Sequence, residues 1–258
     1  MKFLTGFFLA FGCLILTGAE KPVRIADTVG DTVFRSAAVR LTLTGQPVAC
    51  SQEKVTVEKA LAGLQKGEYD LVLAYRSAVP EKQQKFCRDY AVDAVMIAMN
   101  AGNSRNGFTT RELAETFSGE KRSWLTLNGN DFQIHLMRLP DAASAVRIFR
   151  DKVMKKRPFA PAFIRENPME LLRLAVLNEN ALVLTCRPDM ELATGLKAAA
   201  VDEVYPSLEN VKNGRYPLVE RRTVLLPEKP SAGVQMLLKT VLSADMENVI
   251  AEHGLIRP

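Results

Sequence analysis

Side chains that could hold a small anion occur in three loops of the chain, each following a segment predicted to be a strand. An anion withdrawn from water needs hydroxyl donors, a guanidinium group and backbone N–H groups at helix N-termini. Arginine can offer two parallel hydrogen bonds, and an acidic side chain can accept the proton of a partly protonated oxyanion. The candidate ligand-binding residues are Thr28, Asp31, Thr32, Arg76, Ser77, Arg138, Asp141 and Ser144.

The hydrophobic pattern predicts elements that would bring these loops to one edge of a sheet. Strands are predicted at 23–26, 47–50 and 70–75, and helices at 32–43 and 55–66 lie between them. Such alternation is typical of βαβ units and a parallel sheet. Open sheets of this kind bind ligands at the carboxyl ends of their strands, where the candidate loops are expected.

The second half of the chain continues the alternation. Further strands are predicted at 92–99, 132–137 and 181–185, and helices at 144–154, 168–177, 190–199 and after Ser231. Thr109 or Thr110 is predicted to cap another helix, with Glu112 in its first turn. The sequence therefore predicts an α/β fold throughout.

The stretch from Val204 to Leu226 carries the strongest family signal. Asn213-Gly214 predicts a turn between two extended pieces. The run from Pro206 to Leu218, with Glu209, Asn210 and Tyr216, closely resembles a segment of the type 2 periplasmic binding proteins of the phosphate-transport branch. Residues 57–76 and 108–124 resemble the same family, whose second lobe opens with a similar helix followed by a tryptophan, here Trp124.

This resemblance implies a type 2 periplasmic-binding-protein-like fold, in which two α/β lobes, each a mostly parallel sheet flanked by helices, enclose a cleft. The first lobe is expected to comprise residues 22–99 and 217–258, and the second lobe residues 100–216. The resemblance also implies a phosphate-like oxyanion between the lobes, no cofactor, and the membrane subunits of an ABC importer as partners. In the family, the strand matching 70–75 ends in a Ser-Arg pair at the cleft. Here Arg76 is kept and Tyr75 takes the serine position.

The loops depart from the family pattern at its glycines, which let a backbone approach the anion closely. Loop 27–32 keeps Thr28, Gly30, Asp31 and Thr32. The second loop, expected after Cys50, reads Ser51-Gln-Glu-Lys54, and the second-lobe loop reads Pro140-Asp-Ala-Ala-Ser144; neither contains glycine. Glu53 and Asp141 add negative charge that opposes an anion. Phosphate binding is therefore expected to be weak or absent, and Arg76→Ala is expected to abolish any that exists.

The N-terminus predicts export from the cytoplasm. Lys2 precedes an apolar run from Phe3 to Leu16, and Thr17-Gly-Ala19 supplies a small-residue cleavage site. This is the pattern of a signal peptide at residues 1–19, so the protein is expected to be periplasmic or secreted. The alternative is a membrane anchor, although the run is at the lower limit for spanning a bilayer.

The cysteine count admits one disulfide in an oxidising compartment. Removal of the signal peptide leaves Cys50, Cys87 and Cys186. Because Cys50 and Cys87 are both assigned to the first lobe, they are the candidate pair. There is no CxxC motif and there are only two histidines, so no metal site is expected.

Composition and motifs exclude several other functions. The formal net charge of +5 is spread along the chain, and the basic run Lys152–Arg157 lacks aromatic neighbours for stacking on bases. The protein is therefore expected to bind no nucleic acid, and it is expected to be a monomer. Motifs such as GxSxG and HExxH are missing, so no enzyme activity is expected. The alternative to a transport protein is a binding-protein-like domain that serves as a sensor, scaffold or partner-binding module.

Overall fold

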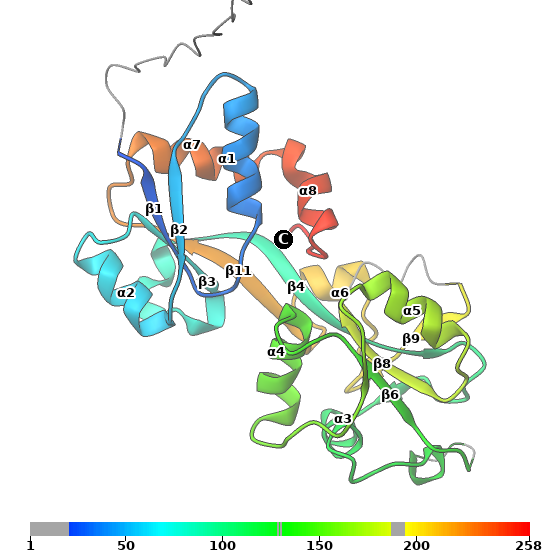
Figure 1. The fold of residues 1–258 in the computed structure, drawn as a ribbon. Helices are drawn as coiled ribbons and strands as arrows, with labels where there is room; N and C mark the ends of the chain where they lie inside the picture. Colours follow the sequence, from blue (N-terminus) through cyan, green and yellow to red (C-terminus); the bar gives the residue numbers. More distant parts are fainter. Residues whose placement is uncertain (1–20, 128, 130, 187–193) are drawn as a thin grey trace, which may run out of the picture.

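The structure, a computed structural model, has two α/β lobes joined by two long strands (Figure 1). It describes residues 21–127, 129, 131–186 and 194–258. The predicted signal peptide lies outside these residues. Among these residues, no helix is both apolar enough and long enough to span a bilayer.

The first lobe is built on a five-stranded mixed sheet. Its strand order is β2 (Cys50–Lys54), β1 (Val23–Asp27), β3 (Leu71–Tyr75), β11 (Val219–Leu225) and β4 (Cys87–Asn100). The first three strands are parallel, as the βαβ pattern predicts, whereas β11 runs antiparallel to both of its neighbours. The carboxyl ends of β1 and β3 therefore meet at the edge of the lobe that faces the junction.

The second lobe shares strand β4 with the first. The last part of β4 pairs antiparallel with β8 (Ala181–Cys186) and β9 (Leu196–Ala198). Strand β6 (His135–Arg138) then pairs parallel with β8 and with the short β7 (Phe163–Ile164). A separate two-stranded pair consists of β5 (Gly107–Phe108) and β10 (Ala200–Val201).

Helices cover the sheets. In the first lobe they are α1 (Val33–Leu43), α2 (Val57–Gln65), α7 (Ala232–Leu242) and α8 (Glu247–Glu252), and in the second lobe α3 (Thr110–Phe117), α4 (Ser144–Phe149), α5 (Pro168–Val176) and α6 (Leu208–Lys212). A π-helical turn (Arg150–Met154) continues α4. Short 3-10 turns occupy Arg76–Ala78, Glu81–Phe86, Trp124–Leu127 and Ala244–Met246.

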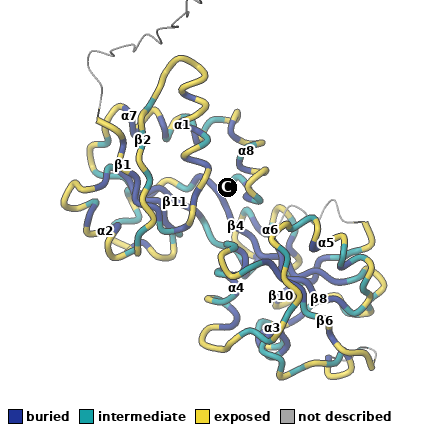
Figure 2. Tube along the Cα trace, in the orientation of Figure 1, coloured by how far each residue is buried: buried dark blue, intermediate teal, exposed yellow. Residues whose placement is uncertain are grey.

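Each lobe has its own apolar core (Figure 2). In the first lobe, Leu71 and Leu73 point into the core under α1 and α7, whereas Val72 and Ala74 point into a smaller core under α2. This alternation explains why β3 reads as a continuous apolar run. The second-lobe core contains β8 and the later part of β4. The lobe boundaries at residues 99 and 217 stay a prediction, because β4 and β11 contribute to both sides of the junction.

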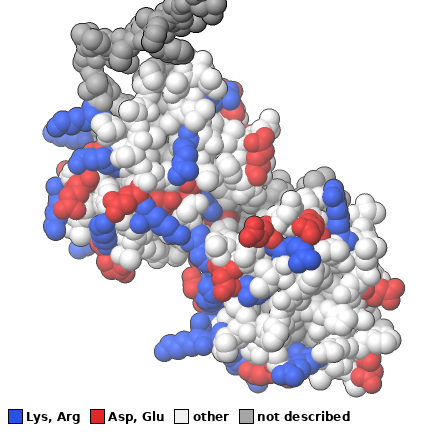
Figure 3. Space-filling view, viewed as in Figure 1, with Lys and Arg blue, Asp and Glu red and all other residues white. Residues whose placement is uncertain are grey.

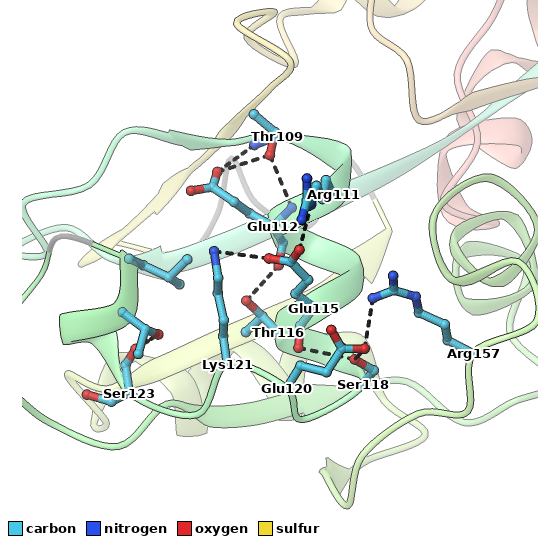
Figure 4. A network of polar contacts seen from close by, with 12 residues as sticks. Thr109, Arg111, Glu112, Glu115, Thr116, Ser118, Glu120, Lys121, Ser123 and Arg157 are labelled. Carbon is cyan, nitrogen blue, oxygen red and sulfur yellow. Dashed lines mark hydrogen bonds and ion pairs between the residues drawn. The ribbon is translucent and has the colours of Figure 1, made fainter.

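Helix α3 illustrates how short helices are fixed at the surface of the second lobe (Figure 4). The side chain of Thr109 accepts a hydrogen bond from the backbone N–H of Glu112, and the Glu112 carboxylate accepts one from the backbone N–H of Thr109. This capping box satisfies two N–H groups that the helix leaves unpaired. Glu115 forms ion pairs with Arg111 and Lys121.

Three predicted elements differ from the structure. Ser51–Lys54, predicted as a loop, belongs to β2, whose polar residues suit an edge strand. Residues 208–212 fall in the stretch predicted as two extended pieces joined by a turn at Asn213-Gly214, but they form α6, which Ser207 caps by accepting a hydrogen bond from the N–H of Asn210. Of the helix predicted at 190–199, residues 190–193 lie outside the described residues, and 196–198 form a strand.

The predicted Cys50–Cys87 disulfide is wrong. The two residues lie on β2 and β4, and strands β1, β3 and β11 separate them. Four strand spacings correspond to about 19 Å, whereas a disulfide needs Cα atoms within about 7 Å. The prediction failed because shared membership of a lobe does not specify where in the sheet each strand lies.

Candidate functional site

The junction between the lobes is lined by loop 27–32 of the first lobe and the start of α4 in the second. The Ser144 hydroxyl donates to Asp93 Oδ1 at 3.0 Å, and the Arg147 guanidinium donates to the backbone carbonyl of Val29. Lys152, on the turn after α4, forms a 3.0 Å ion pair with Glu220 on β11. Helix α4 is thereby held against the first lobe and the connecting strands.

An ionic cluster lies buried at this junction. Arg222 of β11 donates from Nε to Asp93 Oδ2 at 2.6 Å and from Nη1 to Asp31 Oδ2 at 3.2 Å. The side chains of Arg222, Asp31 and Asp93 are 7%, 0% and 4% exposed. Tyr90 donates to Asp31 Oδ2 at 2.6 Å and Tyr75 to Asp93 Oδ2 at 3.1 Å. Both carboxylates are therefore satisfied by donors from several elements.

The electrostatic environment fixes the protonation states of the donors. Burial, followed by the charge of Asp31, raises the pKa of Tyr90 well above its usual value. Burial and then Asp93 raise the pKa of Tyr75 in the same way. Burial lowers the pKa of Arg222, but the charge of Asp93 together with the neighbouring tyrosines and Asp31 outweighs it, so the net pKa is raised. Both phenols thus keep their protons and Arg222 stays cationic.

The backbone N–H groups of loop 27–32 are largely used by the chain's own carboxylates. Asp27 accepts from the N–H groups of Val29, Gly30 and Asp31 at 2.8–2.9 Å. The Gln52 amide donates to the same carboxylate at 2.9 Å. A concave row of N–H groups is an anion-binding arrangement, and here the anion is Asp27.

Two of the predicted ligand-binding residues, Asp31 and Ser144, meet in the ionic cluster. Thr28 and Thr32 lie in the same loop as Asp31, but their side chains do not hydrogen-bond to the three charged residues of the cluster, Asp31, Asp93 and Arg222, within the described residues. The Thr28 hydroxyl donates to the backbone carbonyl of Leu73 at 2.9 Å. Thr32 is the exposed N-cap residue of α1, and its side chain makes no capping hydrogen bond.

The other predicted residues are engaged in ion pairs and hydrogen bonds around the junction. Arg76, 35% exposed, donates to Asp89 at 2.9 Å, and Ser77 donates to Glu220 at 2.8 Å. Arg138 forms a 2.7 Å ion pair with Asp141 and lies over the ring of Phe159. In the described part of the chain, neither arginine forms a hydrogen bond or ion pair with Asp31, Asp93 or Arg222. Their assignment to the ligand remains a prediction.

Sequence reasoning missed Asp93 and Arg222. Asp93 follows Tyr90-Ala-Val in a strand that is otherwise mostly buried, whereas Arg222 follows Glu220-Arg221 and precedes the buried Thr223-Val-Leu, so only Asp93 stands inside an apolar run. A charge inside an apolar run is a signal, because a buried charge must be paired. The register of β11 against β4 shifts between Arg222 and Thr223, where the pairing passes over Tyr90 of β4, and such irregularities redirect side chains.

Charges of both signs mix at the junction and over the surface. Asp31 and Asp93 both pair with Arg222, whereas the Arg147 guanidinium donates to the backbone carbonyl of Val29, so two carboxylates share one guanidinium group. On the face shown in Figure 3, basic and acidic side chains are interspersed over both lobes. Among the described residues, no group of three or more His, Cys, Asp or Glu side chains is arranged to hold a metal ion.

Solved structures support the two-lobed fold. The chain aligns with a possible phosphate binding protein from Planctomyces limnophilus at a TM-score of 0.80 and 17% identity, covering 92% of this chain and 93% of the other. PstS from Borrelia burgdorferi aligns at 0.75 and 14%, covering 92% and 99%. An ABC-type phosphate transport receptor from Vibrio cholerae aligns at 0.71 and 18%, covering 92% and 100%.

The sequence comparisons give the family. No curated protein matches the chain. Residues 25–245 match the model of a family described as a PBP superfamily domain. This match spans most of the chain and both lobes, and it confirms the resemblance to binding proteins found in the sequence. The chain therefore belongs to the PBP superfamily domain family.

Proposed function

We propose that the protein is an extracytoplasmic solute-binding protein that encloses a small solute between its lobes and delivers it to the membrane subunits of an ABC importer. The observation that carries this proposal is the contact of α4 with the first lobe across the junction: Ser144 donates to Asp93 on β4, and Arg147 donates to Val29 in loop 27–32. Loops from both lobes thus converge on one place, as the enclosure of a solute requires.

The ligand class we propose is a small oxyanion bound weakly. Arg222 and the hydroxyl of Ser144 at the start of α4 are donors of the kind that oxyanions need. The similar proteins from Borrelia, Vibrio and Planctomyces are PstS, a phosphate transport receptor and a possible phosphate binding protein. Against tight binding, Asp27, Asp31 and Asp93 already use many of the donors, and an incoming anion would have to displace a carboxylate.

A second candidate is a binding-protein-like domain without transport function, acting as a sensor, scaffold or partner-binding module. The specific observation in its favour is Asp27, which fills the N–H groups of loop 27–32 with an internal carboxylate. In this case the lobes would keep their arrangement without any solute, and no oxyanion would stabilise the protein.

A thermal-shift screen against phosphate, sulfate, molybdate, amino acids and sugars distinguishes the two candidates. A solute present at 100 times its dissociation constant stabilises the folded protein by about 2.7 kcal/mol. We expect at least one solute to raise the melting temperature, and Ser144→Ala to reduce that shift. Ser118→Ala, which removes a similarly half-buried hydroxyl from the far side of the second lobe, is the matched control. No shift with any solute would favour the domain without transport function.

A further inference from the structure

We propose that the carboxylate of Asp93 occupies the position that an oxyanion would take at the lobe junction, and that Asp93 thereby determines which solutes the junction accepts. The inference rests on the proposed function, because it concerns the same junction. It deepens that function by naming the residue that keeps oxyanion affinity low.

The donors around Asp93 form a complete anion-binding set. Arg222 Nε donates to Oδ2 at 2.6 Å, Tyr75 donates to the same oxygen at 3.1 Å, and Ser144 donates to Oδ1 at 3.0 Å. These donors come from β11, from the end of β3 and from the start of α4 in the second lobe. A guanidinium, a phenol and a serine hydroxyl are hydrogen-bond donors of the kind that would surround an oxyanion held between two lobes.

Asp93 differs in this respect from the other two carboxylates at the junction. Asp27 accepts from three backbone N–H groups of its own loop, and Asp31 accepts from the N–H of Phe34 in the first turn of α1. Their carboxylates thus hold local backbone structure, in addition to accepting from side chains: Gln52 donates to Asp27, and Tyr90 and Arg222 donate to Asp31. Within the described residues, the hydrogen bonds of the Asp93 carboxylate all come from side chains on other elements. Its contacts are those of a ligand rather than those of a turn.

A solute anion and Asp93 exclude each other for two reasons. An oxyanion bonded to a guanidinium places its oxygen at about 2.7–2.9 Å from the nitrogen, which is where Asp93 Oδ2 already lies. A second anion beside Asp93 and Asp31 would also experience the repulsion of both charges in a buried site. Removal of the Asp93 carboxylate leaves Arg222 paired with Asp31 alone and frees Ser144 and Tyr75 to donate to a solute.

The test is calorimetric titration of inorganic phosphate and of sulfate into the wild-type protein, Asp93→Ala and Asp70→Ala. Asp70 is the matched control, because it pairs with Arg24 in a two-pronged contact at the opposite end of β3 from the junction. We expect Asp93→Ala to bind phosphate or sulfate at least tenfold more tightly than wild type, and Asp70→Ala to equal wild type. The same anions should raise the melting temperature of Asp93→Ala more than that of wild type.

Two results would overturn the inference. One is a folded Asp93→Ala protein, judged by a cooperative melting transition, that binds both anions no more tightly than wild type. The other is tight phosphate binding by wild type itself. If Asp93→Ala does not fold, Asp93→Asn replaces it, and the absence of any affinity gain in folded Asp93→Asn counts equally against the inference. Failure of the proposed function is seen separately, as wild type responding to no solute in the wider screen.

Discussion

Replacing Arg222 by methionine tests how the buried cluster contributes to stability. Methionine keeps the length and apolar stem of arginine but removes the charge, which leaves Asp31 and Asp93 buried without their shared cation. Removing one partner of a buried ion pair costs about 3–5 kcal/mol. Because Tyr75, Tyr90 and Ser144 still donate to the carboxylates, we expect the loss in unfolding free energy to lie at the lower end, about 3 kcal/mol.

The assay is urea denaturation followed by circular dichroism at neutral pH. Arg24→Met is the matched control, since Arg24 pairs with Asp70 at the surface with 47% of its side chain exposed, and such a pair contributes about 1 kcal/mol or less. A combined Arg222→Met, Asp31→Asn and Asp93→Asn protein should recover part of the loss, because it removes the unpaired charges as well. Equal losses below about 1 kcal/mol for Arg222→Met and Arg24→Met would refute the claim that the cluster is buried and mutually compensated.

Three further outcomes are expected. Because burial raises the pKa of Tyr75 and Tyr90, the folded state holds these protons more tightly than the unfolded chain, so the stability of the protein should fall as the pH rises above about 10. In a pH series of melting temperatures, Tyr90→Phe should make this fall less steep. An unchanged slope would contradict the raised pKa of Tyr90. Non-reducing mass spectrometry should find no Cys50–Cys87 cross-link, and a cross-linked peptide would contradict the sheet order. Arg76 is the anion partner predicted from the sequence, whereas the structure favours Arg222. If Arg222 binds the anion, calorimetry of the best oxyanion should give Arg76→Ala an affinity within threefold of wild type. If Arg76 binds the anion, Arg76→Ala should lose binding.

The sequence predicts the fold well where patterns are local and strong. The apolar run 70–75 and the helices around it give β3, α1 and α2 nearly at their observed bounds. Thr109 or Thr110 is predicted to cap α3 with Glu112 in its first turn, and in the structure Thr109 is the cap, with both reciprocal hydrogen bonds. These predictions are correct because burial of both faces of a strand, and the hydrogen bonds to the unpaired N–H groups at the start of a helix, depend on residues close together in the sequence.

The sequence predicts the site less well, because its key contacts join distant strands. Arg222 lies 129 residues from Asp93 and 191 from Asp31 in the sequence, and its role depends on β11 lying between β3 and β4. The same lack of information on strand order produced the wrong pairing of Cys50 with Cys87. The sequence also predicts a loop at Ser51–Lys54, where the structure has part of β2, because a polar edge strand and a polar loop have similar composition.

The enclosure of a solute between the lobes is tested most directly by hydrogen–deuterium exchange with and without the best solute from the thermal-shift screen. We expect this solute to slow exchange at backbone amides on both sides of the junction, in residues 28–34 of the first lobe and 144–147 of the second. Slower exchange confined to one lobe, or at sites away from both segments, would contradict it.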